Sequence, residues 1–493
     1  MVLNATTDNQ NILMSHAAPP AADATPSSYA DLFRDGRGLY SVLIILGVIV
    51  HALQVLVMAI IMPTVIADIG GGAFYTWASM LYAVGAILGA AAVGPIWRKL
   101  GRRNGLALAG CGFLVGAVAC ALAPDMGSLV AARGIQGFAG GLVVGGSMDL
   151  VSAIFVGTQR ARILSIYQST WMVAQLLGPV VGGAFAEIGW WRGSFWTMLI
   201  FLAPFNLLVW LRIPKVSALT GKAATATFPA GRFALLTAGV FAIAAAGPAG
   251  DALLRTGFIV SGVLLVWQTF RLDGKSPNRL YPSGLLSLRS PVGLALWIVF
   301  VAGLTQSSIT LFLPLLLQVA YGVTPLLISY LTILISAGWT VGGFLVAGWS
   351  GRREDVTLQS GPLMMLIGVA GLVSGTLILS LPLLTAAACL LGLGIGIHHA
   401  NLSSRTIACA LPGEEGITAS SLASLRSLGT AFGAATSGLI ANMAGFGAAR
   451  DAVTVSHAAS MVFAVGLLPL VCAVFFMARF VRKSRPAAAA LPA

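Results

Sequence analysis

Long apolar segments alternate with short polar turns from residue 40 to residue 482. Runs of this kind, about 18 residues or longer, can cross the roughly 30 Å hydrocarbon core of a bilayer as α-helices. Apolar runs bounded by charged or Pro/Gly-marked turns predict about fourteen helical spans. We expect them at 40–67, 74–97, 104–123, 127–155, 162–187, 193–212, 233–249, 252–270, 292–320, 325–349, 358–381, 383–411, 417–445 and 457–482.

Composition supports a membrane protein. The 493 residues are 58% hydrophobic and only 9% charged, whereas soluble domains draw about 25% of their residues from Asp, Glu, Lys and Arg. So little charge cannot solvate a surface of this size. The chain is therefore predicted to be an all-α polytopic membrane protein that lies in a lipid bilayer.

The basic residues predict orientation. The net charge is +13, and most Lys and Arg side chains fall in the N-terminal tail, the even-numbered turns and the C-terminus. Only Arg192, Arg255 and Arg450 fall on the other side. The positive-inside rule then places both termini in the cytoplasm, which requires an even number of spans. This rule explains the charge better than nucleic-acid binding, so no nucleic-acid partner is expected.

The grouping of six, two and six spans predicts two similar bundles. We expect a disordered cytoplasmic tail at 1–39, a six-helix bundle at 40–212, linkers and two inserted helices at 213–291, a second bundle at 292–482 and a tail at 483–493. Duplicated bundles are typical of secondary transporters, whose binding sites lie between the halves.

Enzymatic chemistry is not expected. The five cysteines lie in or beside apolar segments without a CxxC pair, so neither disulfides nor a metal is indicated. The sequence contains no nucleophile constellation and no phosphate-binding loop. No cofactor is predicted.

Four ordered motifs carry a family resemblance. "GPIWRKLGRR" (94–103) follows the second span, "RGIQGFAGG" (133–141) opens the fourth, "GPVVGG" (178–183) lies in the fifth and "WWRGSFW" (190–196) starts the sixth. Together they resemble the major facilitator superfamily, particularly its fourteen-helix drug:proton antiporter branch. "FLPLLLQVAYGVTP" (312–325) and "SLASLRSLGTAFGA" (421–434) are also similar to that branch.

The resemblance implies a major facilitator fold and roles for several residues. Arg133 matches the arginine linked to proton coupling, with Gln136 beside it, although an arginine near a helix start can also extend to the membrane interface. Gly178, Pro179, Gly182 and Gly183 match a motif associated with closing the pathway between the halves. Plain helix packing is the alternative for these residues.

The loop after the second span departs from the family pattern. The family usually carries an aspartate where this chain has Arg98, and Glu414 and Glu415 begin the thirteenth span. We therefore expect a latch of opposite sign, in which Arg98 pairs with Glu414 or Glu415; solvated loop charges are the alternative. The residues expected to contribute to conformational gating are the four motif residues above with Gly94, Arg98, Gly101, Arg102, Arg103, Glu414, Glu415 and Arg426.

Asp149 is the only carboxylate deep within a predicted span. An ionisable residue at such depth is a functional candidate. Asp149 should also lie near Arg102 and Arg103, so a structural salt bridge is an equal alternative.

The first span lacks the family's usual aspartate and carries Gln54 in its place. A carboxamide cannot exchange a proton, so another group must titrate if transport is proton-coupled. Histidine is the obvious candidate, with a reference pKa of about 6.5. His51, His398 and His399 lie in spans, and by resemblance their helices line a central cavity; interhelical hydrogen bonding is the alternative. Adjacent residues diverge by about 100° on a helix, so at most one of His398 and His399 should point inward.

Other polar and aromatic side chains within the spans are expected to line a substrate cavity, or else to bond helices together. With Gln54 and Gln136, they are Gln168, Trp171, Gln175, Gln306, Ser307, Thr310, Trp339, Asn401 and Arg405.

These features predict a secondary transporter, a monomer in a bacterial inner membrane, that exports a small amphipathic organic molecule in exchange for protons. The scarcity of cavity acids favours a neutral or anionic substrate over a lipophilic cation. An uptake symporter or uniporter of the same fold, and a non-transporting receptor of that fold, remain alternatives.

Overall fold

The computed structural model describes residues 29–34, 37–155, 157–213, 229–276, 279–447 and 451–484. Every regular element in these ranges is helical. The first six-span region contains α2 (Gly38–Ile69), α3 (Trp77–Ala121), α4 (Met126–Ile154), α5 (Gly157–Glu187), the short α6 (Gly193–Trp196) and α7 (Met198–Arg212), with the 3₁₀ turn η2 (Gly72–Phe74) after α2.

The rest of the chain continues the pattern. α8 (Ala230–Ala245) and α9 (Ala252–Lys275) form a pair, and the last group contains α10 (Pro291–Val319), α11 (Pro325–Leu345), α12 (Arg352–Leu377), α13 (Leu381–Ala408), α14 (Glu415–Met443) and α15 (Ala452–Ser484).

Eleven segments of the described residues are long and apolar enough to cross a membrane. The number differs from the predicted fourteen for identifiable reasons. α3 runs through two predicted spans, and only Gly101, at φ 77° and ψ 164°, breaks its helical geometry. α8 has 16 residues and is shorter than a typical span. α14, which covers most of the predicted span at 417–445, is not among the eleven either.

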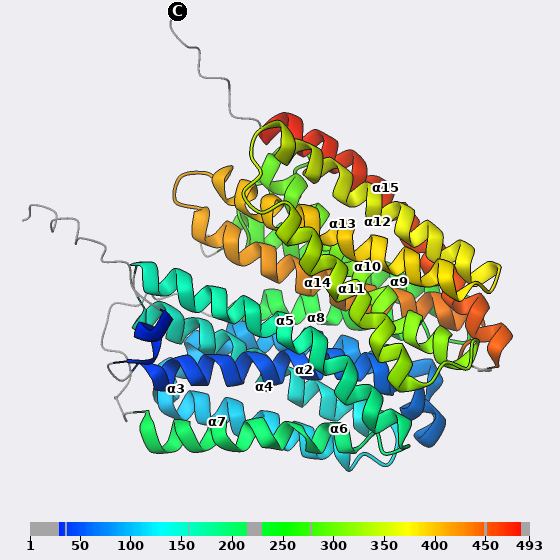
Figure 1. Ribbon diagram of the computed structural model, residues 1–493, viewed down its shortest axis with the longest axis horizontal. Helices are drawn as coiled ribbons and strands as arrows, with labels where there is room; N and C mark the ends of the chain where they lie inside the picture. Colours follow the sequence, from blue (N-terminus) through cyan, green and yellow to red (C-terminus); the bar gives the residue numbers. More distant parts are fainter. Residues whose placement is uncertain are drawn as a thin grey trace, which may run out of the picture.

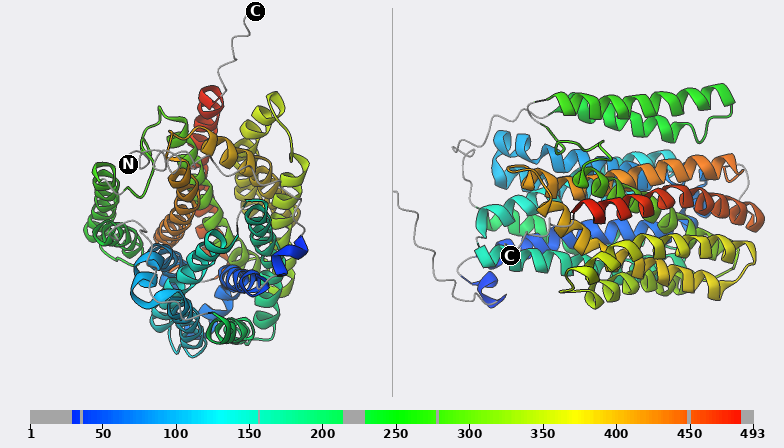
Figure 2. Two further views of the ribbon diagram at one scale, coloured as in Figure 1. Left: turned by 90° about the vertical axis from the view of Figure 1, so that its left-hand side faces the viewer. Right: turned by 90° about the horizontal axis from the view of Figure 1, so that it is seen from above.

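The helices form two groups that lie side by side (Figure 1). α2–α7 make the first bundle and α10–α15 the second. Seen along the helices and from above, α8 and α9 lie at the outside of the molecule (Figure 2). α8 contacts α14 of the second bundle and α3 of the first, so the inserted pair covers one edge of the boundary between the bundles.

Two boundaries differ from prediction, one because a side chain of the tail is buried and one because acidic residues lie at a helix start. The tail is not disordered throughout: Tyr29–Phe33 form the 3₁₀ helix η1, the Leu32 side chain is fully buried, and Ser41 Oγ donates to the Leu32 carbonyl at 2.7 Å. α12 begins at Arg352 instead of residue 358, with Glu354 and Asp355 in its first turn, where carboxylates interact favourably with the helix dipole.

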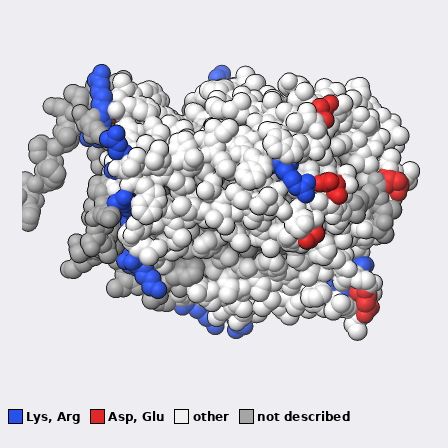
Figure 3. Space-filling model, turned by 90° about the horizontal axis from the view of Figure 1, so that it is seen from below, with Lys and Arg blue, Asp and Glu red and all other residues white. Residues whose placement is uncertain are grey.

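Charge is divided between the two ends of the bundles. On the face in Figure 3, Lys and Arg gather at one end and Asp and Glu toward the other. We call the end that carries residues 98–103, 352–353 and 482–483 the basic end. The opposite end, which carries Asp68, Glu187 and Asp251, is called the acidic end.

Candidate functional site

The two bundles meet at the acidic end through backbone and side-chain hydrogen bonds. Tyr75 Oη donates to the Leu311 carbonyl at 2.7 Å, and Asn442 Nδ2 donates to the Ala73 carbonyl at 2.9 Å. The backbone N–H of Leu326 donates to a Glu187 carboxylate oxygen at 3.1 Å. These contacts join the segment around η2 and the end of α5 in the first bundle to α10, α11 and α14 in the second.

The glycine motif in α5 packs against two different helices. A Cβ atom on Gly178 would lie 2.7 Å from Leu56 Cβ, so this glycine packs against α2 of the same bundle. On Gly183, a Cβ would lie 2.1 Å from Ser329 Oγ of α11, in the other bundle. The motif therefore packs within its own bundle at Gly178 and across the boundary between the bundles at Gly183.

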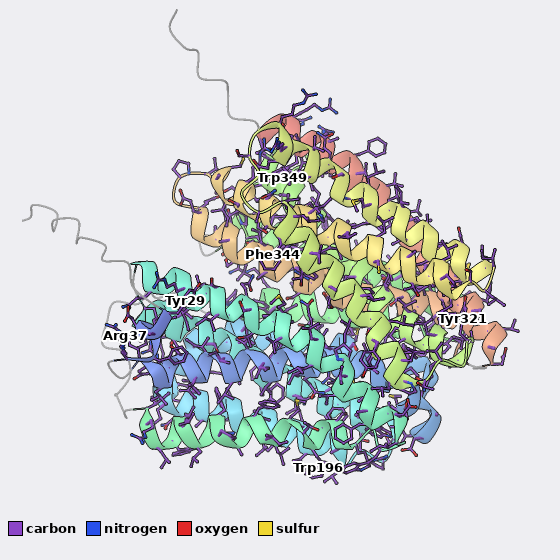
Figure 4. The ribbon with its side chains drawn as sticks, viewed as in Figure 1. Tyr29, Arg37, Trp196, Tyr321, Phe344 and Trp349 are labelled. Carbon is purple, nitrogen blue, oxygen red and sulfur yellow. The ribbon has the colours of Figure 1, made fainter. Side chains whose placement is uncertain are left out.

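Toward the basic end the two bundles diverge (Figure 1). The second-bundle helix α11 carries large exposed side chains there, including Phe344 (73% exposed) and Trp349 just after its end. Figure 4 shows both near the end where the bundles are apart. The described contacts therefore correspond to a state joined at the acidic end.

A polar cluster lies inside the first bundle, made of His51, Tyr82, Arg133 and Gln136. Tyr82 Oη lies 2.9 Å from His51 Nδ1, and the Arg133 guanidinium lies over the Tyr82 ring at 4.1 Å. Arg133 Nη1 donates to Gln136 Oε1 at 2.6 Å. Arg133 is 1% exposed and Gln136 fully buried, so Arg133 does not extend to the interface. The His51 ring also meets the edge of Trp171, with centroids 5.9 Å apart.

A comparable cluster lies inside the second bundle, made of Gln306, Trp339, His399 and Arg426. Arg426 Nη2 donates to Gln306 Oε1 at 3.0 Å, and Nη1 lies 3.5 Å from His399 Nε2. The guanidinium lies over the Trp339 ring at 4.6 Å. Four helices (α10, α11, α13 and α14) supply these side chains. A pocket borders three of them and is otherwise lined by Val299, Ala302, Ile395, His398 and Leu402.

The paired histidines have different surroundings. His398 is 2% exposed, and its Nδ1 lies 2.6 Å from the Gly394 carbonyl of its own helix. A Cβ atom on Gly361 of α12 would lie 2.5 Å from that nitrogen, so His398 packs on α12. His399 instead meets Trp339 edge-on at 5.6 Å. The contacts of His51 lie in the first bundle and those of His399 in the second.

Arg133 and Arg426, the arginines of the two clusters, differ from Arg405, which has carboxylate partners. Arg405 Nη1 lies 2.6 Å from Asp355 Oδ1 and 3.8 Å from Glu354 Oε1. Arg405 was expected to line a substrate cavity, and in the structure it forms an ion pair that joins α13 to α12. Among ion pairs of the described residues, none includes Arg133 or Arg426.

Other cavity candidates are dispersed. Gln54 is fully buried, and neither its Oε1 nor its Nε2 has a hydrogen-bond partner among the described residues. Asn401 Nδ2 donates to Thr357 Oγ1 of α12 at 3.3 Å. Gln168 is exposed, Gln175 and Thr310 are half-buried, and Ser307 is buried.

Residues expected at the cytoplasmic gate gather at the basic end. Asp149 Oδ2 lies 2.8 Å from Arg102 Nε and accepts a hydrogen bond from Trp97 Nε1 at 3.2 Å. Arg103 donates to the Trp210 carbonyl and lies over its ring. Arg98 and Gly94 are exposed.

Glu414 is bound to the segment that connects α9 to α10. Its carboxylate accepts hydrogen bonds from Ser283 Oγ at 2.5 Å and from the Ser283 backbone N–H at 3.0 Å. Glu415 is the exposed first residue of α14. Arg426, expected to take part in gating, instead lies among cavity candidates.

Sequence reasoning missed Tyr82 and Ser329. Tyr82 connects His51 to Arg133, and Ser329 joins α11 to α5. Both residues could have been selected from the sequence, because a phenol or hydroxyl within an apolar span needs a hydrogen-bond partner.

Two apposed helical bundles, joined at one end and carrying polar clusters inside, have the architecture of a transporter. The sequence pattern of the Major Facilitator Superfamily matches residues 44–434. The chain belongs to the Major Facilitator Superfamily. It is therefore a transporter and not an enzyme.

Relatives and solved structures agree. The chain is 28% identical over 437 residues to the probable multidrug-efflux transporter Rv1634 of Mycobacterium tuberculosis, covering 86% of this chain and 91% of that protein. It is 25% identical over 434 residues to the multidrug transporter protein MdtP of Bacillus subtilis, covering 83% and 77%. A D-xylose-proton symporter shares the fold, with a TM-score of 0.63 at 16% identity over 92% of this chain and 99% of that one.

Proposed function

We propose that this superfamily member exports a small amphipathic organic molecule from the cytoplasm by alternating access, in exchange for protons. The observation that carries the proposal is the joining of two bundles at the acidic end while they diverge toward the basic end (Figure 1). Alternating access requires that such contacts break when those at the other end form. The names of the relatives as multidrug-efflux transporters support export.

For topology, we propose fourteen spans, in which α3 contributes two across Gly101 and α6 and α7 together contribute one. The excess of Lys and Arg at the basic end makes this the cytoplasmic side under the positive-inside rule. Both chain ends then lie in the cytoplasm, and the state with the acidic end joined faces inward. A monomer in a bacterial inner membrane fits these features.

For proton coupling, we propose the His51 cluster and His399 as the groups that exchange protons. His51 faces Tyr82, Trp171 and Arg133, and His399 faces Trp339 and Arg426. A proton gained or lost beside a buried arginine changes the electrostatic energy of one conformation more than the other. Asp149 is the weaker candidate because it already pairs with Arg102.

The test is transport by the full-length protein in proteoliposomes, with a pH-sensitive dye in the lumen and a panel of organic solutes. Export predicts that an imposed pH gradient drives solute against its concentration while protons move oppositely. Solute and protons moving together would instead identify a symporter, and solute movement that ignores the pH gradient would identify a uniporter.

A receptor of transporter fold would bind solute without any flux or counterflow. Each of these results contradicts proton-coupled export in a distinct way.

A further inference from the structure

Arg426 is a half-buried cation within a predicted span, and the described side chains that contact it are electrically neutral or basic. It contacts Gln306 and His399 and lies over Trp339. Placing an arginine within a membrane span costs about 2.5–3.5 kcal/mol on insertion scales, and such residues usually have a partner or a function. The chain supplies carboxylates elsewhere, since Arg405 is flanked by Asp355 and Glu354.

The hydrogen-bonding groups around Arg426 are mainly donors. A guanidinium carries five N–H donors and accepts nothing. Only the Oε1 atom of Gln306 is engaged by Arg426, and the Gln306 amide nitrogen is a further donor. In its 3.5 Å contact with Arg426 Nη1, His399 Nε2 serves as an acceptor, because a guanidinium has none, so the donors left over are the other guanidinium N–H groups and the Gln306 amide. A group that matches several convergent donors beside a cation is an oxyanion, above all a planar carboxylate.

The same pocket offers apolar surface beside these donors. Its lining includes Val299, Ile395 and Leu402, and the Trp339 ring adjoins Arg426. One end of the pocket thus suits a charge and the remainder suits an apolar body. Few polar groups among apolar walls are typical of sites for small organic ligands.

From this juxtaposition we propose that Gln306, Trp339, His399 and Arg426 form the substrate subsite for a carboxylate attached to an aromatic or apolar body. The Arg426 guanidinium binds the carboxylate, and Gln306 fixes the orientation of that guanidinium. The pocket walls and Trp339 contact the apolar body. The inference rests on the proposed transport function and assigns its substrate to the amphipathic organic anions.

The test uses three probes of one shape and different charge: 2-naphthoate, 2-naphthamide and 2-naphthylmethylammonium. Binding to purified full-length protein at pH 7.5 is measured by isothermal titration calorimetry. We expect 2-naphthoate to bind at least about tenfold more tightly than either other probe, since charge-assisted bidentate hydrogen bonds are the stronger class. Equal affinity for the three probes, tighter binding of the ammonium, or no saturable binding of 2-naphthoate would overturn the proposal.

Variants localise the preference. Arg426→Gln should lower 2-naphthoate affinity to that of the amide, and Arg426→Lys, which keeps the charge but loses the planar fork, should lower it less. Arg482→Gln, at the exposed end of α15, removes the same charge and should change nothing. A carboxylate preference that survives Arg426→Gln would place the anion elsewhere and refute this assignment.

Folding and transport are separable readouts. Thermal unfolding monitors whether each variant is folded, and the comparison of probes on the wild-type protein decides the preference even if Arg426→Gln does not fold. Binding of 2-naphthoate without flux in proteoliposomes would reject the transport proposal and leave the subsite standing. Flux of other solutes, with no preference for the carboxylate probe in binding, would support the transport proposal and reject the subsite.

Discussion

Ser329 Oγ in α11 donates a hydrogen bond to the Pro179 carbonyl in α5 at 2.6 Å, across the boundary between the two bundles. The same Oγ lies 2.9 Å from the Pro325 carbonyl oxygen of its own helix, so its single hydrogen is shared between two acceptors. A carbonyl oxygen has two lone pairs, so Pro179 can accept this bond without leaving its helix. The approach is possible because Gly183, one turn later, has no side chain.

Gly183→Ala should separate the bundles at the acidic end. The added Cβ would lie 2.1 Å from Ser329 Oγ and 2.9 Å from the Pro325 carbonyl oxygen, which no packed structure tolerates without a shift. Spin labels at positions 188 and 327, both exposed, should report a longer distance by double electron–electron resonance. Transport should fall by about tenfold or more, because one of the two states is disfavoured.

Gly466→Ala in α15 is the matched control, because its Cβ would meet no atom within 4 Å. An unchanged label distance in Gly183→Ala would show that α11 can adjust without opening.

Asp149→Asn should preserve proton-driven transport. The Asp149–Arg102 pair has side chains 28% and 25% exposed, and pairs of this kind contribute about 0.2–1 kcal/mol to stability. We expect a small fall in melting temperature and an intact response of flux to the pH gradient. Reversing the pair, with Arg102→Asp and Asp149→Arg together, should recover stability lost in the single variants. Loss of proton-driven flux with counterflow retained would instead assign the proton to Asp149.

Much of the fold could be predicted from hydropathy, because lipid demands long apolar helices with internally satisfied backbones. Helix ends were less predictable. The α3 kink depends on the left-handed φ of Gly101, and the early first turn of α12 places Asp355 where it pairs with Arg405 of α13. Neither feature changes the hydropathy pattern from which the spans were predicted.

The site was predictable only where it is local. Arg133 and Gln136 are three residues apart on one helix, so their contact follows from helical spacing. The Arg426 cluster draws on four helices, and its assembly depends on how those helices rotate and pack. Sequence reasoning therefore named Gln306, Trp339, His399 and Arg426 separately, and assigned Arg426 to gating.

Arg98→Glu should impair transport, and adding Glu414→Arg should restore it, if the two residues form a latch in the outward-facing state. In the present state Glu414 accepts hydrogen bonds from Ser283, which lies in the segment that connects α9 to α10. The latch therefore requires Glu414 to exchange Ser283 for Arg98 as the bundles close at the basic end. Flux in proteoliposomes measures the rescue, with Glu415→Arg as the neighbouring control. A double variant as inactive as Arg98→Glu would count against this latch.

Gln54→Leu should raise stability. The Gln54 carboxamide is fully buried, and neither of its polar atoms has a partner among the described residues. An unsatisfied buried amide costs about 1–3 kcal/mol, and leucine has nearly the same volume without that cost. Thermal unfolding without substrate should therefore shift upward, while a substrate that uses this amide should bind more weakly. A lower melting temperature would mean that the amide is satisfied in the protein, for example by water.

Removing both candidate histidines should uncouple solute movement from protons. His51→Gln retains a side-chain oxygen that can accept from Tyr82 Oη, and His399→Gln retains a polar group beside Arg426, so packing around both clusters is largely kept. Glutamine does not titrate between pH 5 and 8, whereas histidine has a reference pKa of about 6.5.

The double variant should lose proton-driven flux by about tenfold or more and keep solute counterflow, measured in the same proteoliposomes. His457→Gln, at an exposed site of α15, should retain both activities. Full proton-driven flux in the double variant, and also after His398→Gln is added, would show that none of the three histidines carries the coupled proton.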